Sequence, residues 1–403
     1  MASGSVGERI AAYRRRRGLS QTALAGLVGR SESWLSQVER GIRSVDRLSV
    51  LLDLAKVLHV DVEALTGAPW QYAPNGGSVP DSLSEVRQFL SRYDSLLGVA
   101  PDRPTTVPEL DLAVTAAHEA YQAARYEDVI AGLPALLSQA DSLHRTAFDG
   151  RRDVLIGYSA AYALAAKLLT KVGAGDLSIL AADRCATAAV EADSMTARGL
   201  AAYQVVCALL RSERPEDAEP LAVGMAEEAQ RNARADRPTL ASVAGSLWLI
   251  AAVIASRRTE QAEAWRRLDQ AQALADMLGA DGNHAWTAFG PTNVGIHRVS
   301  VAAELGDPAA ALRAAESVDL DRLPKGLKSR RAQMHLHLGW AEAQRKRDAD
   351  AVLHLLEAER IAPESVRYNV IVGELVRGML ARQKRGGRTS ALHNLALRAG
   401  VLR

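Results

Sequence analysis

Apolar residues recur along this chain mainly at steps of three and four positions. Ala, Leu, Arg and Glu are arranged in this way through almost the whole length, whereas the strict alternation of a half-buried strand is nearly absent. These four residue types also favour helix through their intrinsic propensities. The pattern therefore predicts an all-α protein.

Two stretches rich in proline and glycine interrupt the helical pattern, at residues 67–80 and 99–108. Both residue types end helices and mark turns or loops. We therefore predict a head at residues 1–67, linkers at residues 68–108 and a tail at residues 109–403.

A short amphipathic segment between the two breaks predicts a connecting helix at about 81–98. Its apolar residues follow alternating steps of three and four: Leu83, Val86, Leu90, Tyr93 and Leu97. This spacing is typical of a helix laid on a neighbouring surface, and also of the seam of a short coiled coil. Packing on the tail and a contact in a dimer therefore both remain open.

The tail repeats a turn that leads into a helix. The small residues at the last four of these turns are Ala218, Ala262, Ala310 and Ala351, separated by 44, 48 and 41 positions. A period of this size is typical of stacked helical hairpins, in which each repeat contacts only its neighbours. We expect five or six hairpins over residues 109–400.

The final unit of the tail has the clearest pattern. It carries Leu338 and Gly339 on a first helix, Ala351, Leu355 and Ala358 on a second, and then Pro363. These residues resemble the tetratricopeptide repeat, whose small residues let two helices approach closely and whose proline ends the second helix. The resemblance implies a tetratricopeptide-like α-solenoid with a curved surface lined by the first helix of each hairpin.

The composition is that of an ordinary globular protein, with 48% hydrophobic and 24% charged residues. Charged side chains interrupt the Ala-rich stretches, so we expect no apolar run of the 18 or so residues that a membrane span needs. The two cysteines, Cys185 and Cys207, provide neither a disulfide framework nor a metal-ligand cluster. We therefore expect a soluble cytoplasmic protein without metal ligands and without a membrane partner.

Positive charge is concentrated at the front of the chain. Residues 1–47 carry nine arginines and four carboxylates, although the net charge of the whole chain is only +2. An excess of basic residues in one segment is typical of a surface that contacts nucleic acid.

The same segment contains two short amphipathic helices separated by a glycine. Over residues 21–38 the apolar positions would bury one face of each helix, and Gly29 can adopt the positive φ that a tight turn needs. Ser20 and Ser31 stand where the two helices would begin, and are candidate amino-terminal caps. This arrangement predicts a helix-turn-helix motif.

Over residues 6–66 the head resembles the helix-turn-helix domain of the XRE, or Cro-type phage-repressor, family. The matching residues include Gly18–Gln21, the run Ser31–Gly41, Leu54, Ala55 and Leu58. The resemblance implies a domain of five helices, with Ser31–Arg40 as the recognition helix in the major groove of a double-stranded DNA operator. It also implies a homodimer, because one short helix reads only a few base pairs.

The resemblance assigns nine residues to the DNA-binding surface: Gln21, Arg30, Ser31, Glu32, Ser33, Ser36, Gln37, Arg43 and Arg47. Glu32, Ser33 and Gln37 would face base edges, and Gln21 would meet a phosphate. The three arginines would contact phosphates, with the minor groove as an alternative for the last of them. Since no Arg or Lys occupies a base-facing position, bidentate contacts to guanine are not expected.

Two further features of the head concern its fold. Arg14 and Glu39 match a pair that forms a partly buried ion bridge in the XRE family, which assigns both side chains to holding the domain together. Trp34 has two interpretations: it packs on the head, which we favour, or it lies against a sugar-phosphate strand.

A head of this type followed by a tetratricopeptide-like tail resembles the peptide-pheromone receptors of Gram-positive bacteria and related regulators of actinomycetes. The likeness of the tail is architectural, so no ligand residue of the family transfers to this chain. The resemblance implies a peptide or small-molecule effector in the curved groove. It also implies that the tail mediates dimerisation.

Unusual side chains among the Ala and Leu residues of the tail are the candidates for effector binding. They are Tyr158, Tyr162, Tyr203, Trp248, Trp286, Phe289, Asn293, His297, Gln333 and Trp340. An Asn amide can hold a peptide backbone, and Trp or Tyr can cover an apolar ligand surface. The alternative is that aromatic residues at helical spacing fill the core of the solenoid.

The chain carries only fragments of catalytic motifs. Residues 157–161, 118–119 and 173–175 begin a nucleophile elbow, a zinc-binding helix and a dinucleotide loop, and none of the three continues. We therefore expect no enzyme, no catalytic residue and no cofactor. The predicted function is a ligand-controlled transcription regulator, with a DNA-binding protein whose tail is a docking scaffold as the alternative, and an enzyme with an accessory head as the least favoured.

Overall fold

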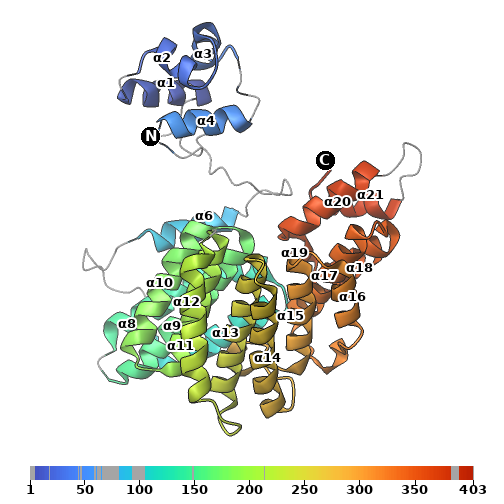
Figure 1. Cartoon of the computed structure of the whole chain (residues 1–403). Helices are drawn as coiled ribbons and strands as arrows, with labels where there is room; N and C mark the ends of the chain where they lie inside the picture. The colour runs from blue at the N-terminus through green and yellow to red at the C-terminus, as the bar shows by residue number, and fades with distance from the viewer. Residues whose placement is uncertain are drawn as a thin grey trace. The chain divides into compact units, whose positions relative to one another are not determined.

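A computed structural model describes residues 5–17, 19–43, 45, 48–58, 60, 65, 81–92, 105–147, 149–212, 214–382 and 390–402. The chain divides into two compact units, a head unit (Met1–Tyr72) and a repeat unit (Ala73–Arg403). Every regular element in the described residues is helical, which confirms the all-α prediction (Figure 1).

The head unit is built from short amphipathic helices around one core. Its described helices are α1 (Val6–Arg16), α2 (Gln21–Leu27), α3 (Glu32–Glu39) and α4 (Leu48–Leu58). Each contributes an apolar face, and Ile10, Leu24, Leu35 and Leu54 are completely buried. The predicted fifth helix falls on residues of which only Leu65 near its end is described; this side chain is buried in the same core.

The turn between α2 and α3 follows from local chemistry. Ser20 Oγ accepts a hydrogen bond from the Ala23 amide at 3.0 Å, and Ser31 Oγ accepts one from the Trp34 amide at 3.2 Å. Both predicted caps are therefore confirmed. Gly29 has a φ of +63°, the left-handed conformation predicted for the turn.

The crossing of α1 over α3 depends on Gly7. A Cβ atom at this position would lie 1.9 Å from the carbonyl oxygen of Val38, so only glycine allows the two helices to approach so closely. This contact fixes α3 on the head unit from the side opposite to its polar face.

The repeat unit is a series of antiparallel helical pairs. Its helices are α6 (Asp81–Leu90), α7 (Val107–Gln122), α8 (Tyr126–Thr146), α9 (Arg151–Val172), α10 (Gly175–Glu191), α11 (Met195–Arg211), α12 (Pro215–Arg231), α13 (Pro238–Arg257), α14 (Gln261–Leu278), α15 (Pro291–Glu304), α16 (Pro308–Ala315), α17 (Lys328–Gln344), α18 (Asp348–Ile361), α19 (Pro363–Arg367), α20 (Val370–Arg382) and α21 (Ser390–Arg398). Two 3₁₀ turns, η2 (His284–Trp286) and η3 (Leu320–Arg322), interrupt the connections.

Consecutive helices form six hairpins from α7–α8 to α17–α18, and α20–α21 form a further pair in the described residues. The predicted number of five or six hairpins is therefore one too low.

The two ends of the repeat unit touch each other. The Tyr126 hydroxyl, at the start of α8, lies 2.9 Å from the Ser365 hydroxyl of α19, and both are buried. Beside them Arg367 donates to Glu127 at 2.6 Å. The first hairpin also packs against α17. The prediction that each repeat contacts only its neighbours is therefore wrong for the first hairpin, because the row of helices closes on itself.

The connecting helix α6 packs on the repeat unit. Leu83, Val86 and Leu90 are buried against α8 and α10. Arg87 pairs with Asp176 of α10 at 2.5 Å. Of the two alternatives for this segment, packing on the tail is the one observed, and the described part of the seam is not free for a second chain. The remaining seam positions, Tyr93 and Leu97, lie outside the described residues.

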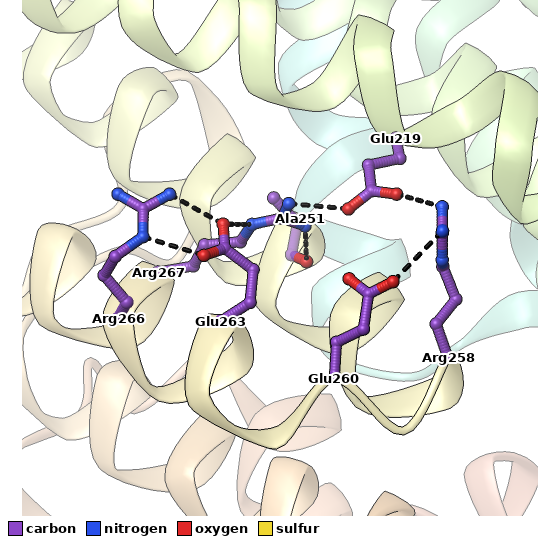
Figure 2. Close-up of polar contacts among 7 residues, drawn as sticks. All are labelled: Glu219, Ala251, Arg258, Glu260, Glu263, Arg266 and Arg267. Carbon is purple, nitrogen blue, oxygen red and sulfur yellow. Dashed lines mark hydrogen bonds and ion pairs between the residues drawn. The ribbon is translucent and has the colours of Figure 1, made fainter.

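A buried arginine ties three central helices together (Figure 2). Arg267 of α14, whose side chain is 7% exposed, donates to Glu219 of α12 at 2.6 Å and to the Ala251 carbonyl of α13 at 2.8 Å. It also donates to Glu263 of its own helix at 2.7 Å. Every polar bond of this guanidinium is thus made inside the protein.

Helix α13 corrects the prediction that no apolar run reaches membrane-spanning length. It is long and apolar enough for a span, with a mean hydropathy of 1.9 over 18 residues, but 83% of that window is buried inside the repeat unit. The charge-free run is the central core helix, packed between α12 and α14. It was overlooked because small residues, Ala, Ser and Gly, dilute the aliphatic ones.

Candidate functional sites

One face of α3 carries short polar side chains. Glu32 and Ser33 are exposed and Ser36 and Gln37 are partly exposed, whereas the opposite face is buried in the head core. Glu32 accepts a hydrogen bond from the Thr22 hydroxyl at 2.8 Å. This face of α3 therefore presents a row of small hydrogen-bond donors and acceptors.

Basic and aromatic residues flank this polar face. Arg30 and Arg43 are exposed, and the guanidinium of Arg30 lies 5.7 Å from the ring centre of Trp34. Trp34 is partly buried against the head core, which confirms the packing interpretation. Ser31 acts as the cap of α3, and Arg47 lies outside the described residues.

The predicted ion pair between Arg14 and Glu39 is confirmed. Two guanidinium nitrogens of Arg14 donate to the two carboxylate oxygens of Glu39 at 2.6 and 2.9 Å. Burial by itself raises the pKa of Glu39, but hydrogen bonds from Arg14 and Gln21 outweigh burial and hold that pKa below its ordinary value. The Gln21 amide donates to Glu39 at 2.7 Å, so Gln21 also takes part in the fold, and its contact with a phosphate stays a prediction.

A polar cavity of about 250 Å³ lies among the helices of the repeat unit. Its polar lining comes from the first helices of several hairpins: Tyr121 and Gln122 of α7, Lys167, Thr170 and Lys171 of α9, Tyr203, Gln204 and Cys207 of α11, Ser246 of α13, and Ser329, Arg330 and Gln333 of α17. These helices thus line the inner surface, as the sequence predicts. Only Tyr126 comes from a second helix, at the very start of α8.

Three cations face the polar cavity. Lys167 and Lys171 stand one turn apart on α9, with their ammonium nitrogens 5.4 and 5.6 Å from the ring centres of Tyr121 and Tyr126. Burial, together with the positive charge of Arg330, lowers the pKa of Lys167 to about 8. The cavity therefore gathers three positive charges, and the charge of Arg330 disfavours the protonated form of Lys167.

An apolar cavity of about 560 Å³ adjoins the polar one. The two share Lys167, Leu200, Gln204, Ala285 and Trp286 as lining residues. The surface of the remaining wall is mostly apolar, with Val114, Ile156, Ala160, Ala163 and Ala197 from α7, α9 and α11, although Asp111, His118, Ser159, Ser194, Thr196 and Thr239 also line it. A polar compartment thus opens beside a larger apolar one.

The loop between α14 and α15 closes one side of both cavities. Asn283 and Gln122 exchange two hydrogen bonds of 2.8 Å, although they lie 161 residues apart. Trp286 stacks on His118 of α7, with ring centres 4.1 Å apart. Ala285, like Trp286, has a positive φ, a conformation that costs free energy for residues other than glycine. The loop is therefore held in a strained shape by contacts with the first hairpin.

The comparisons with known proteins bear first on the head. Residues 5–66 match the family described as a helix-turn-helix domain. Residues 5–66 are a helix-turn-helix domain. A search of curated proteins finds no match to this chain. The chain therefore joins a helix-turn-helix domain to a closed row of helical hairpins, and α3 is the second helix of the motif.

Three solved structures are similar to the chain at low identity. They are PlcR of Bacillus thuringiensis in complex with the peptide PapR7 and DNA (12% identity, 77% of this chain and 92% of that chain, TM-score 0.35), ComR of S. thermophilus in complex with DNA and its signalling peptide ComS (15%, 94% and 99%, 0.30), and the apo form of the competence regulator ComR of Streptococcus vestibularis (13%, 74% and 97%, 0.22).

Three of the ten predicted effector residues, Tyr203, Trp286 and Gln333, line the polar cavity. Three others are core residues. Tyr162 is completely buried, with its hydroxyl donating to Asp141 at 2.8 Å. Trp248 is buried, with its ring nitrogen donating to Gln230.

Phe289 is the third core residue, and it fills the space that Gly245 leaves on α13. The last four predicted residues also stay outside the two cavities. Tyr158 packs on Tyr162, with ring centres 4.6 Å apart, and Trp340 packs on the core. Asn293 and His297 are buried on α15, where the imidazole lies 2.8 Å from the Asn293 carbonyl.

The prediction missed the cations of the polar cavity. Lys is rare in this chain, with seven residues against 42 arginines, and two of the seven stand four apart within an apolar segment of α9. A lysine on the apolar face of a helix is the signal that was available, because such a side chain is seldom buried without a reason. Arg330 gave no comparable signal, since arginines are frequent throughout the tail.

Proposed function

We propose that this chain is a cytoplasmic, sequence-specific DNA-binding transcription regulator whose repeat unit senses a ligand. One observation supports the proposal above all: a helix-turn-helix domain with an open polar face on α3 stands in the same chain as a cavity of ligand size. DNA is the partner of the first part, and a peptide or small molecule is the partner of the second.

In this proposal α3 lies in the major groove of the operator. Ser33 and Gln37 reach base edges, where a Gln amide bonds adenine in two places and a Ser hydroxyl bonds either donors or acceptors. Arg30 and Arg43 contact phosphates on either side. The two half-sites of a symmetric operator require two copies of the chain, so a homodimer is part of the proposal.

The cavities favour a small ligand over a docking scaffold. Volumes of about 250 and 560 Å³ lie in the range of pockets that enclose molecules of drug size. A protein partner would instead need an extended surface of several hundred Å². Helices of five different hairpins line the polar cavity, so a ligand bound there can shift the repeat unit between two arrangements only if it binds one of them more tightly.

The DNA part is tested with the substitution Gln37→Ala in the full chain. We expect a loss of about 1–3 kcal/mol in affinity for the operator, mapped by footprinting upstream of the chain's own gene, with binding to random DNA nearly unchanged. The matched control is Arg43→Ala, which should weaken binding to both DNAs and flatten the salt dependence. Equal losses of Gln37→Ala on operator and random DNA would contradict the proposed role of α3.

A further inference from the structure

The polar cavity has an unbalanced charge. Among its described lining residues Lys167, Lys171 and Arg330 are cations, and none is Asp or Glu. The thiol and phenols beside them are neutral, since burial raises the pKa of Cys207 to about 11 and that of Tyr203 to about 12. No ion pair in the described part of the chain involves any of the three cations. A negatively charged group in the cavity would relieve their repulsion.

A buried hydroxyl in the same cavity has an open hydrogen-bonding position. Ser246 is 8% exposed, and its Oγ has no hydrogen-bond partner among the described residues. Buried polar atoms without partners are costly and often mark a place where a ligand or water is expected. Ser246 stands on α13 and lines the same cavity as the cations of α9 and α17.

The adjoining apolar cavity extends this site. Leu200 and Trp286 belong to both walls, so one molecule can reach from the cations into aliphatic surroundings. The one acidic residue of the apolar wall, Asp111, is exposed to solvent. His118, which is buried there, is uncharged because burial and Lys167 hold its pKa well below its ordinary value. The larger compartment thus suits a hydrocarbon or aromatic group.

We infer that the sensed ligand is a small organic anion with an apolar tail, its carboxylate or comparable acidic group bound by Lys167 and Arg330 and its tail in the apolar cavity. The inference rests on the proposed function and adds the chemical class of the ligand. The same chemistry occurs at the free carboxyl terminus of a short apolar peptide, so both sources are included in the test.

The experiment uses the full chain and the fluorescent anion 1-anilinonaphthalene-8-sulfonate, which combines a sulfonate with apolar rings. We expect saturable binding that Lys167→Met and Arg330→Gln each weaken roughly tenfold to a hundredfold, because a charge-assisted hydrogen bond is lost. Lys167→Arg should restore binding. The matched control is Lys328→Met, which removes an exposed cation of α17 that does not line either cavity.

Displacement of the probe distinguishes the sources of the anion. Decanoate is compared with decylamine, and an apolar tetrapeptide with a free carboxyl terminus is compared with the same peptide amidated. Displacement by decanoate alone supports a small organic anion, and displacement by the free-acid peptide alone supports a peptide carboxylate. Equal displacement by the charged and the uncharged or cationic member of each pair would overturn the inference, as would unchanged probe binding in Lys167→Met and Arg330→Gln.

Thermal melting shows whether a variant that loses probe binding has lost the binding site alone or also the stability of its fold. Lys167→Met should melt at or above the temperature of the parent chain, because it removes a cation that lacks a carboxylate. A variant that binds no probe and also melts early would assign Lys167 to the fold and overturn its role in binding. The fluorescence assay contains no DNA, so its failure leaves operator recognition intact, whereas a bound anion that does not alter operator affinity would refute the sensing function and leave the site in place.

Discussion

Arg267 and Lys167 are both cations enclosed by the repeat unit, and their surroundings differ in one respect. Arg267 meets two carboxylates and a carbonyl, so that each of its three guanidinium nitrogens donates to an acceptor on one of three helices (Figure 2). Lys167 meets a tyrosine ring, a second cation and a cavity. The first arrangement is complete within the protein, and the second becomes complete only with a further group. The comparison teaches that burial alone does not distinguish a structural cation from a binding one. The difference lies in whether the cation has partners within the protein.

The largest effect should come from Arg267→Met. It removes the shared partner of Glu219 and Glu263, which keep their bonds to the more exposed Arg258 and Arg266, and we expect a loss of about 3 kcal/mol in the free energy of unfolding. Urea titration followed by circular dichroism measures it. Its neighbour Arg266, which is 57% exposed and pairs with Glu263, is the matched control, and Arg266→Met should cost less than about 1 kcal/mol. Similar losses in both variants would remove the distinction between the two arginines.

The ion pair of Arg14 with Glu39 in the head unit is also complete within the protein, and breaking it should cost less stability than Arg267→Met. Arg14→Met leaves Glu39 unpaired except for the Gln21 amide, and we expect a loss of about 2–3 kcal/mol. The double variant with Glu39→Leu should recover part of it, which a double-mutant cycle in urea measures. Because Glu39 has a lowered pKa in the folded state, the stabilisation by the pair is present above its unfolded pKa and is lost as pH falls through the folded one. Strictly additive single effects would show that the two side chains do not interact.

The smallest effect concerns Lys167, whose surroundings lack a carboxylate, and the way in which it makes stability depend on pH. Burial and Arg330 lower the pKa of Lys167 to about 8, while the unfolded chain keeps its lysines protonated to near 10.5. Between these pH values the unfolded state binds more protons, so from about pH 7 to 9 the parent chain should gain about 1.4 kcal/mol in stability relative to Lys167→Met. Melting curves of the two proteins from pH 7 to 10 measure the difference. A parent chain that loses stability relative to Lys167→Met as pH rises would mean that Lys167 is favourably paired.

The sequence correctly predicted the structural features that depend on residues close together in the chain. The caps Ser20 and Ser31, the turn at Gly29 and the helical repeat all follow from spacing within a few positions, and each is present. The ion pair of Arg14 with Glu39 came from the family resemblance, and it is also present.

The cavities depend on contacts between distant residues, and these were not predicted. Gln122 meets Asn283 across 161 positions, and α9 and α17 line one cavity although they belong to distant hairpins. Aromatic residues such as Tyr162 and Trp248 were therefore assigned to a groove when they fill the core. Burial depends on which face of a helix meets a neighbour, and one sequence without its partner helices does not fix that face.

The closure of the repeat unit has a consequence for how the protein folds during its synthesis. Tyr126 meets Ser365, so the first hairpin leaves the ribosome 239 residues ahead of the helix it finally packs against. At usual rates of bacterial synthesis this amounts to roughly 10–50 s. During that interval the side of α7 and α8 that later faces α17 and α19 is open to solvent in the nascent chain. In an open solenoid each repeat can complete its contacts soon after it leaves the ribosome. Here the first hairpin lacks its final contacts until α17 and α19 have been synthesised.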